Sequence, residues 1–373
     1  MTELTPQFLD RSGAQPSGPE IWPALVVPRA SIEREIERLA DLDRPDNGRR
    51  ASAVVHPYAK APGLGLAPGT DVTINVLKPG EESAPIRRNS NQLEMCVRGT
   101  GVVEVSGEQI RLEKWDVCNI PSMQVYRHRN TGDDLFVCFT YSNAPVLEKL
   151  GVHYVEEDPD PSIIRRPRPT EPWKPQESAF EVDLETGGAK MRSYEYLVDI
   201  DVVESKALHW PWAKVRENLP FAPRTNNRGI MLLYNPATER RNGTTHSFFA
   251  TMSGGTRSNR PPEVKRGHRH SSSSINYYFL GNGGKSVVDG QTYEWGVGDL
   301  MLSAPGWSEH AHYMGSPDGS PVDQGTLTVQ DHPMHIAIES LIWQEEMDGR
   351  IHALGSEAGV KNYIGPRRKI VQP

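Results

Sequence analysis

The sequence is poor in cysteine, in long apolar runs and in excess positive charge. Its three cysteines, Cys96, Cys118 and Cys138, form no Cys-x-x-Cys pair and lie in apolar, strand-like segments. We expect them to be reduced core residues, as is typical of a cytoplasmic protein. No apolar run approaches the length of a membrane span, and the first twenty residues show no charged-then-apolar leader.

The charge balance gives no sign of a nucleic-acid or membrane partner. The 373 residues carry a net charge of −7, with a pI near 6.0, and basic runs are short and interrupted. Hydrophobic residues make up 36% of the chain, whereas Gly (33) and Pro (31) are abundant. This composition favours many short strands and turns over long helices.

Short alternating strands with regular turn signals fill two parts of the chain, which predicts an all-β sandwich or barrel in each. In the first part they read VTINVL, QLEMCV, GVVEVSG, DVCNI and LFVCFTY. The predicted domains are an arm and helix (1–48), a β domain (49–155), a Pro-rich linker and interdomain segment (156–226), a second β domain (227–345) and a tail (346–373). Ser31 is the expected N-cap of the early helix, Pro45 its stop, and residues 340–355 are expected to start with a short helix.

Three histidines of the second β domain have the spacing of metal ligands. His268 and His270 are two residues apart, so both imidazoles lie on one face of a strand. His310 follows forty residues later and can return to the same place through hairpins. Neutral imidazoles bind Fe, Zn, Cu, Ni or Co. The alternative is that these are core or surface residues among the twelve histidines of the chain.

An internal repeat argues for the metal site. Aligned without gaps, the first β domain places Ile86 and Arg88 where the second has His268 and His270. Five residues beyond a matched proline stand Tyr126 and His310. The first domain therefore keeps the turn glycines and prolines but has none of the ligands, and its one nearby imidazole, His128, cannot hold a metal alone.

These motifs resemble the cupin superfamily, through the His-x-His pair with Gly283 and the later Gly298-Asp299, Pro305 and His310. Two such domains, three-His ligation and the Trp-x-x-His-x-His run are similar to the gentisate 1,2-dioxygenase family, which includes salicylate and 1-hydroxy-2-naphthoate dioxygenases. The resemblance implies a bicupin: two jelly-roll β-barrel domains with a few short helices, in a homo-oligomer.

The chain departs from the family pattern in three ways. The best-known members hold iron in the first cupin, which here has lost its ligands. Asn276 stands in the region of the usual glutamate and of an arginine common in the family. Ala311 replaces the aspartate of a His-Asp-His second motif.

Three neutral imidazoles leave a divalent iron with its full charge and about three open positions. A 2-hydroxy- or 2-aminobenzoate can chelate through its carboxylate and ortho heteroatom, and O₂ can take the third position. The expected function is therefore a non-haem Fe(II) dioxygenase that cleaves a gentisate- or salicylate-type ring between the carboxyl-bearing and ortho-substituted carbons. The alternatives are a Zn-, Mn- or Ni-dependent cupin isomerase or lyase, and a non-catalytic cupin that binds a small molecule.

Each further site candidate allows a functional and a purely structural interpretation. His312, two residues past His310, is a candidate acid/base or a satisfied barrel histidine. Asn276 is a candidate substrate donor or a core polar residue, while Tyr278 and Trp307 are candidate aromatic walls or core residues.

Arg257 and Arg260 lie in a polar loop that is either a lid over the substrate or simply solvated. Arg269 points away from the metal by strand alternation. His332 and His335 lack the two-residue spacing and are expected to be core or surface residues on a late strand.

Overall fold

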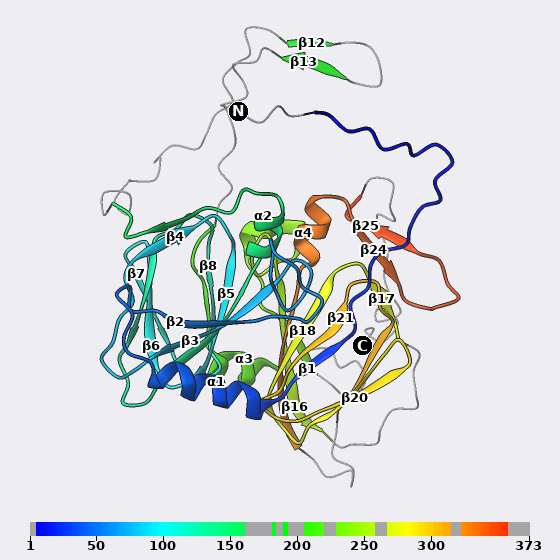
Figure 1. Ribbon diagram of the computed structural model, residues 1–373. Helices are drawn as coiled ribbons and strands as arrows, with labels where there is room; N and C mark the ends of the chain where they lie inside the picture. The colour runs from blue at the N-terminus through cyan, green and yellow to red at the C-terminus, as the bar shows by residue number, and fades with distance from the viewer. Residues whose placement is uncertain are drawn as a thin grey trace.

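The computed structural model describes residues 5–160, 181–183, 189–192, 205–219, 229–257, 267–314 and 322–356. Figure 1 shows two β sandwiches side by side, the first drawn mainly in blue to green and the second mainly in yellow to orange. All strand pairs within them are antiparallel. The prediction of an all-β, jelly-roll architecture with a few short helices is confirmed.

The first sandwich consists of two sheets, named here in order of neighbouring strands. The larger is β14 (His209–Trp210), β8 (Val117–Ile120), β5 (Gln92–Arg98), β10 (Phe136–Ser142), β3 (Asp71–Leu77) and β2 (Arg50–Val54). The smaller is β11 (Val155–Glu157), β4 (Ile86–Arg88), β9 (Tyr126–Asn130), β6 (Gly101–Val105) and β7 (Glu108–Leu112).

The second sandwich repeats this plan. Its large sheet is β1 (Leu25–Val27), β21 (Leu300–Pro305), β18 (Ser273–Leu280), β23 (Val322–Gln330), β16 (Phe249–Arg257) and β15 (Gly229–Leu232). Opposite lie β20 (Gln291–Trp295), β19 (Gly284–Val288) and β22 (His310–Met314), and then β17 (Arg269–His270), β24 (Leu341–Gln344) and β25 (His352–Leu354). Outside the sandwiches are the hairpin β12 (Glu181–Asp183) and β13 (Lys190–Arg192), the helices α1 (Arg29–Asp41), α2 (Ala144–Lys149), α3 (Trp212–Asn218) and α4 (His332–Ala337), and the 3-10 helix η4 (Pro236–Arg241).

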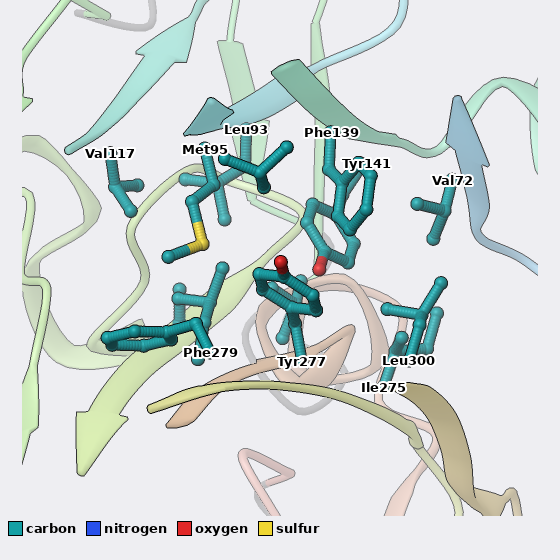
Figure 2. Packing of buried hydrophobic residues seen from close by; sticks show 14 of the residues in the cluster. Val72, Leu93, Met95, Val117, Phe139, Tyr141, Ile275, Tyr277, Phe279 and Leu300 are labelled. Carbon is teal, nitrogen blue, oxygen red and sulfur yellow. The ribbon is translucent and has the colours of Figure 1, made fainter. Parts of the chain in front are cut away.

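The largest hydrophobic core lies between the two large sheets, which pack back to back. Figure 2 shows Phe139 of β10 facing Tyr277 of β18, and their ring centroids are 4.9 Å apart. The opposite faces of the same strands point into their own sandwich, as the buried Cys96 and Cys138 do in the first. Because both faces are covered, every residue of β10 and all but the last residue of β5 and of β18 are buried, polar residues included. All three cysteines are free and buried, as predicted.

Each sandwich receives an edge strand from a segment that the sequence indicated to be an arm or a linker. β1 pairs with β21 of the second sandwich, and β14 pairs with β8 of the first. An exposed sheet edge carries unpaired N–H and C=O groups, and these short strands satisfy them. The two sandwiches are thus tied together by backbone hydrogen bonds as well as by the shared core.

The early helix has the predicted buried face but a different start. Ile32, Ile36 and Leu39 are buried in α1, as expected. Ser31 is wrong as the N-cap, because the helix begins after Pro28 and the backbone N–H of Arg29 is instead satisfied by Asp299 Oδ1 of the second sandwich, 2.7 Å away. The sequence could not show this partner, which lies 270 residues further along the chain.

Two predictions about the late chain are also wrong. The helix expected in residues 340–355 is the hairpin β24–β25, and the histidines expected on a late strand lie on the helix α4. Among the described residues, no helix has the length and apolar character that crossing a membrane requires.

Candidate metal centre

The structure brings together the three histidines that the spacing singled out. One nitrogen of each of His268, His270 and His310 lies within 4.8 Å of the others. A backbone bridge aligns two of them: His268 and His310 exchange N–H···O bonds of 3.2 and 2.9 Å. His270 follows on β17, two residues after His268, so its ring returns to the same side.

Backbone carbonyls fix the orientation of two rings. His270 Nδ1 lies 2.8 Å from the Ser272 carbonyl oxygen, and His310 Nδ1 lies 3.0 Å from that of Ser308. A carbonyl only accepts, so each Nδ1 carries the proton and donates it. The lone pair is then on Nε2 in both rings. This arrangement is typical of metal-binding histidines, whose second nitrogen is held by an outer partner.

His270 fits a metal ligand better than a core residue. The side chain is fully buried, and its Nε2 has no hydrogen-bond partner among the described residues. Burial, together with the neighbouring His310, His332 and His268, holds the pKa of His270 well below its usual range. The ring is therefore neutral at physiological pH, as a metal ligand must be. An orphaned, desolvated nitrogen is costly unless something binds it.

The sequence missed two aromatic side chains at this centre. The Trp343 ring stacks on His268 at 4.9 Å with an interplanar angle of 15°, and it lies 4.9 Å from His270. The His332 ring meets His270 edge-on at 4.9 Å.

Strand pairing explains both positions. β17 pairs with β24, which places His270 opposite Trp343. β23 ends beside the start of β18, so the helix that follows brings His332 to the site. His332 therefore packs against a predicted ligand, a contact that its sequence spacing did not indicate, and its assignment as a core or surface residue stays a prediction. His335, which is hydrogen-bonded to Ser340 Oγ at 2.7 Å, makes no ring contact with the three histidines in the described structure.

Asn276 and Tyr278 point into the interior of the second sandwich. Asn276 Nδ2 lies 2.9 Å from Ser303 Oγ and 3.2 Å from Tyr278 Oη, whereas its Oδ1 is buried without a partner among the described residues. The Tyr278 ring stacks on Trp295 at 3.5 Å. Tyr278 packs in the hydrophobic cluster with Trp295 and Met301, and the Asn276 amide keeps one open hydrogen-bonding atom, its acceptor Oδ1.

His312 lies on β22 next to the centre. Its ring centroid is 5.6 Å from that of His310, and its Nδ1 lies 2.8 Å from Ser286 Oγ. Trp295 Nε1–H donates to the same hydroxyl at 3.0 Å. Ser286 is therefore free to donate its own proton to His312 Nδ1, which would leave the ring proton on Nε2.

The remaining candidates are not brought to the histidines by any described contact. The Arg269 guanidinium lies 4.5 Å above the Trp307 ring and donates to Gln344 Oε1, in agreement with its expected outward direction. Trp307 remains a prediction as a substrate wall. Arg257 is the last residue of β16, and Arg260 lies outside the described residues.

Comparison with known proteins gives a consistent picture. No family model matches the chain. A 5-aminosalicylate 1,2-dioxygenase of Comamonas sp. is 24% identical over 295 residues, 75% of this chain and 72% of the relative. A 1-hydroxy-2-naphthoate 1,2-dioxygenase of Nocardioides sp. is 26% identical over 303 residues, 79% of this chain and 72% of the relative. The crystal structure of a salicylate 1,2-dioxygenase from Pseudaminobacter salicylatoxidans is similar in fold, with a TM-score of 0.67, 15% identity and coverage of 89% and 91% of the two chains.

The chain has a bicupin fold, and its sequence is similar to those of 1,2-dioxygenases named for aminosalicylate, nitrosalicylate and hydroxynaphthoate. Strand register supports the repeat that the sequence indicated within this bicupin. Ile86 pairs with Tyr126 in the first cupin as His268 pairs with His310 in the second. Arg88 follows Ile86 on the same strand, as His270 follows His268. In the described part of the chain, the metal-ligand group belongs to the second cupin alone.

Proposed function

We propose that this bicupin is a non-haem Fe(II) dioxygenase that cleaves the ring of a 2-hydroxy- or 2-aminobenzoate of the gentisate or salicylate type. The observation that carries the proposal is the group of three clustered imidazoles, two of which are held through Nδ1 by backbone carbonyls. The names of the relatives, which are 1,2-dioxygenases of aminosalicylate and hydroxynaphthoate, favour this chemistry over other cupin reactions.

When held by His268, His270 and His310, Fe(II) would supply open coordination positions and the redox chemistry that ring cleavage by O₂ requires. The donor set fits this ion, because three neutral nitrogen ligands leave the charge of the metal to be balanced by an anionic chelating acid. The Ser272 and Ser308 carbonyls keep the two rings in one tautomer. Trp343 and His332 cover the sides of His268 and His270 and so exclude water.

Two residues beside the ligands would handle the substrate. His312 would hold a proton on Nε2, because Ser286 can donate to its Nδ1, and could exchange that proton with the ortho substituent of the acid. The unpartnered atom of Asn276 is Oδ1, an acceptor, so the amide would accept from the hydroxyl or amino group of the acid, because its Nδ2 already donates to Ser303 and Tyr278. Tyr278, Trp307, Arg257 and Arg260 remain proposals as substrate-binding residues.

The test is anaerobic loading of the purified chain with Fe(II), followed by O₂ uptake with gentisate, salicylates, aminobenzoates and hydroxynaphthoates. We expect consumption of one O₂ per ring with at least one of these acids, and none in a His268→Ala variant. Absence of O₂ uptake with every acid of the panel would contradict the proposal. Retention of Zn, Mn or Ni by protein purified without added metal, with no O₂ uptake, would favour an isomerase or lyase. Binding of an acid that survives His268→Ala, again with no uptake, would favour a non-catalytic cupin.

The assembly and the domain limits remain proposals. We propose a cytoplasmic homo-oligomer whose cupins span residues 49–155 and 227–345. Light scattering coupled to size-exclusion chromatography would give the number of subunits, and a monomer would contradict it.

A further inference from the structure

The interior of the first cupin contains a polar cavity of about 210 Å³ where the second cupin has its metal centre. Its lining includes Asp71, Arg88, Gln92, Glu94, Tyr126 and His128. The volume lies below the roughly 300–1,000 Å³ of pockets for drug-sized ligands, which points to a small molecule. The loss of the metal ligands has therefore left a built interior and not a filled apolar core.

Arg88 puts a permanent positive charge at the position of the ligand His270. Its Nε is buried and has no hydrogen-bond partner among the described residues, and its guanidinium lies 5.8 Å over the Tyr126 ring. A desolvated donor on a cation is expensive to leave unpaired. An anion in the cavity would both accept this hydrogen bond and balance the charge. A planar carboxylate matches the geometry of the guanidinium donors.

Two other residues of the cavity lining carry an unpaired donor and an unpaired acceptor. Tyr126 Oη donates to Gln92 Oε1 at 3.1 Å, which fixes the direction of the amide. Gln92 Nε2 is consequently the outward donor; the side chain is 1% exposed and Nε2 has no partner in the described structure. Asp71 Oδ1 is likewise buried and without a hydrogen-bond partner there, although the carboxyl as a whole is hydrogen-bonded by Ser142. The cavity thus offers two unpaired donors and one unpaired acceptor.

Several other polar side chains of the cavity are already paired with one another. His128 Nε2 and Glu94 Oε2 lie 2.7 Å apart, and Thr140 Oγ1 donates to Glu94 Oε1 at 2.9 Å. Asn75 Nδ2 in turn donates to Thr140 Oγ1 at 2.9 Å. This contrast identifies Arg88, Gln92 and Asp71 as the groups that await a ligand.

We propose that the first cupin is a metal-independent binding site for a small carboxylic acid that also carries a hydroxyl or amino group. Its carboxylate would accept from Arg88 Nε and Gln92 Nε2, and its hydroxyl or amino group would donate to Asp71 Oδ1. The guanidinium supplies the positive charge that the metal supplies in the second cupin. This site is separate from the proposed dioxygenase centre and does not depend on it.

The test is calorimetric titration of the full-length chain, stripped of metal and carrying His270→Leu so that the second cupin cannot chelate the probe. Salicylate, 2-aminobenzoate and benzoate are the probes. We expect one site per chain for salicylate or 2-aminobenzoate, and weaker binding of benzoate, which lacks the donor. Arg88→Gln should weaken binding about ten- to hundredfold, the range for a hydrogen bond to a charged group.

Arg87→Gln is the matched control. Arg87 is the neighbour of Arg88 on β4, but it does not line the cavity and pairs with Glu156. Its variant should bind within about twofold of the parent, since no cavity contact is lost. Gln92→Leu, a smaller change, serves if Arg88→Gln does not fold. Absence of saturable binding for all three probes, or equal affinity in the parent and in the folded cavity variant, would overturn the proposal. Neither outcome bears on O₂ uptake.

Discussion

Replacement of His270 by leucine should separate a metal ligand from an ordinary buried histidine. Without metal, the native ring holds a desolvated Nε2 with no partner among the described residues. Its Nδ1 lies 2.8 Å from the Ser272 carbonyl oxygen, to which it donates, and 2.9 Å from Ser272 Oγ. Leucine removes the orphaned group, worth about 1–3 kcal/mol, and loses the hydrogen bond, worth about 1 kcal/mol. The metal-free variant should therefore be as stable as the wild type or up to about 2 kcal/mol more stable.

With metal, the order should reverse. A ligand at a thousandfold excess over its Kd stabilises the native state by about 4 kcal/mol. Structural zinc sites bind with about 10–16 kcal/mol through four ligands, or roughly 3 kcal/mol each. Loss of one ligand should therefore weaken binding about a hundredfold, which leaves about 1.4 kcal/mol of stabilisation at the same metal concentration.

The assay is anaerobic urea denaturation of wild type and variant, each with and without Fe(II). His56→Leu is the control, because His56 is also buried (2% exposed) but is bonded through both nitrogens, to the Pro23 carbonyl and the Tyr58 N–H. That variant should lose about 1–3 kcal/mol whether or not metal is present. If His270→Leu costs as much as His56→Leu in metal-free protein, and Fe(II) stabilises all three proteins equally, the assignment of His270 as a ligand is refuted.

Three further predictions concern other contacts. Trp343→Leu removes the ring stacked on His268, and we expect O₂ uptake to fall about tenfold while iron content is retained. Trp343→Phe keeps a ring and should stay within about threefold of the wild type. Unchanged uptake in the leucine variant would contradict a role of Trp343 in shielding the site. Burial raises the pKa of Asp71 from 3.8 to about 6, so folding favours its neutral form, and the associated stability is complete below pH 3.8 and lost as pH rises through 6. Asp71→Asn should consequently gain at most about 3 kcal/mol at pH 8 and almost nothing at pH 3.5, and equal gains at both pH values in thermal unfolding would exclude this cause. Asp299→Ala removes the acceptor for the N–H groups of Arg29 and Gly296 and should lower the free energy of unfolding by about 1–2 kcal/mol in urea denaturation. Glu33→Ala, which breaks an exposed ion pair of the same helix, should change it by less than about 0.5 kcal/mol. Equal effects of the two variants would argue against Asp299 as the cap of α1.

Much of the fold was predictable because its signals are local. Alternating strands, turn glycines and the two-residue spacing of His268 and His270 depend on a backbone period that is visible in the sequence. The repeat added a long-range constraint, since the register that pairs Ile86 with Tyr126 also pairs His268 with His310. Matching the two copies is therefore sufficient to predict that these three histidines lie together.

Other features depended on partners far away in the chain. The first N–H group of α1 is bound by Asp299. Helix-capping rules consider only residues next to the helix start, whereas Asp299 lies 270 residues further along the chain. Trp343 and His332 reach the centre through the pairing of β17 with β24 and through the end of β23 beside β18. The residues next to Trp343 and His332 in the sequence show no metal-ligand spacing. The local pattern therefore gave no reason to place either residue at the metal centre.

The sequence by itself indicated two β domains and one group of three histidines that could hold a metal, because strand period and repeat register constrain side chains of the same strand or of matched strands. Only the tertiary structure decided what surrounds them. It placed Trp343 and His332 against the ligands, gave His270 an unsatisfied nitrogen, and left Arg88 and Gln92 as unpaired donors in the first cupin. Burial and hydrogen-bond satisfaction are properties of every atom within a few ångströms, and those atoms come from strands that only folding brings together.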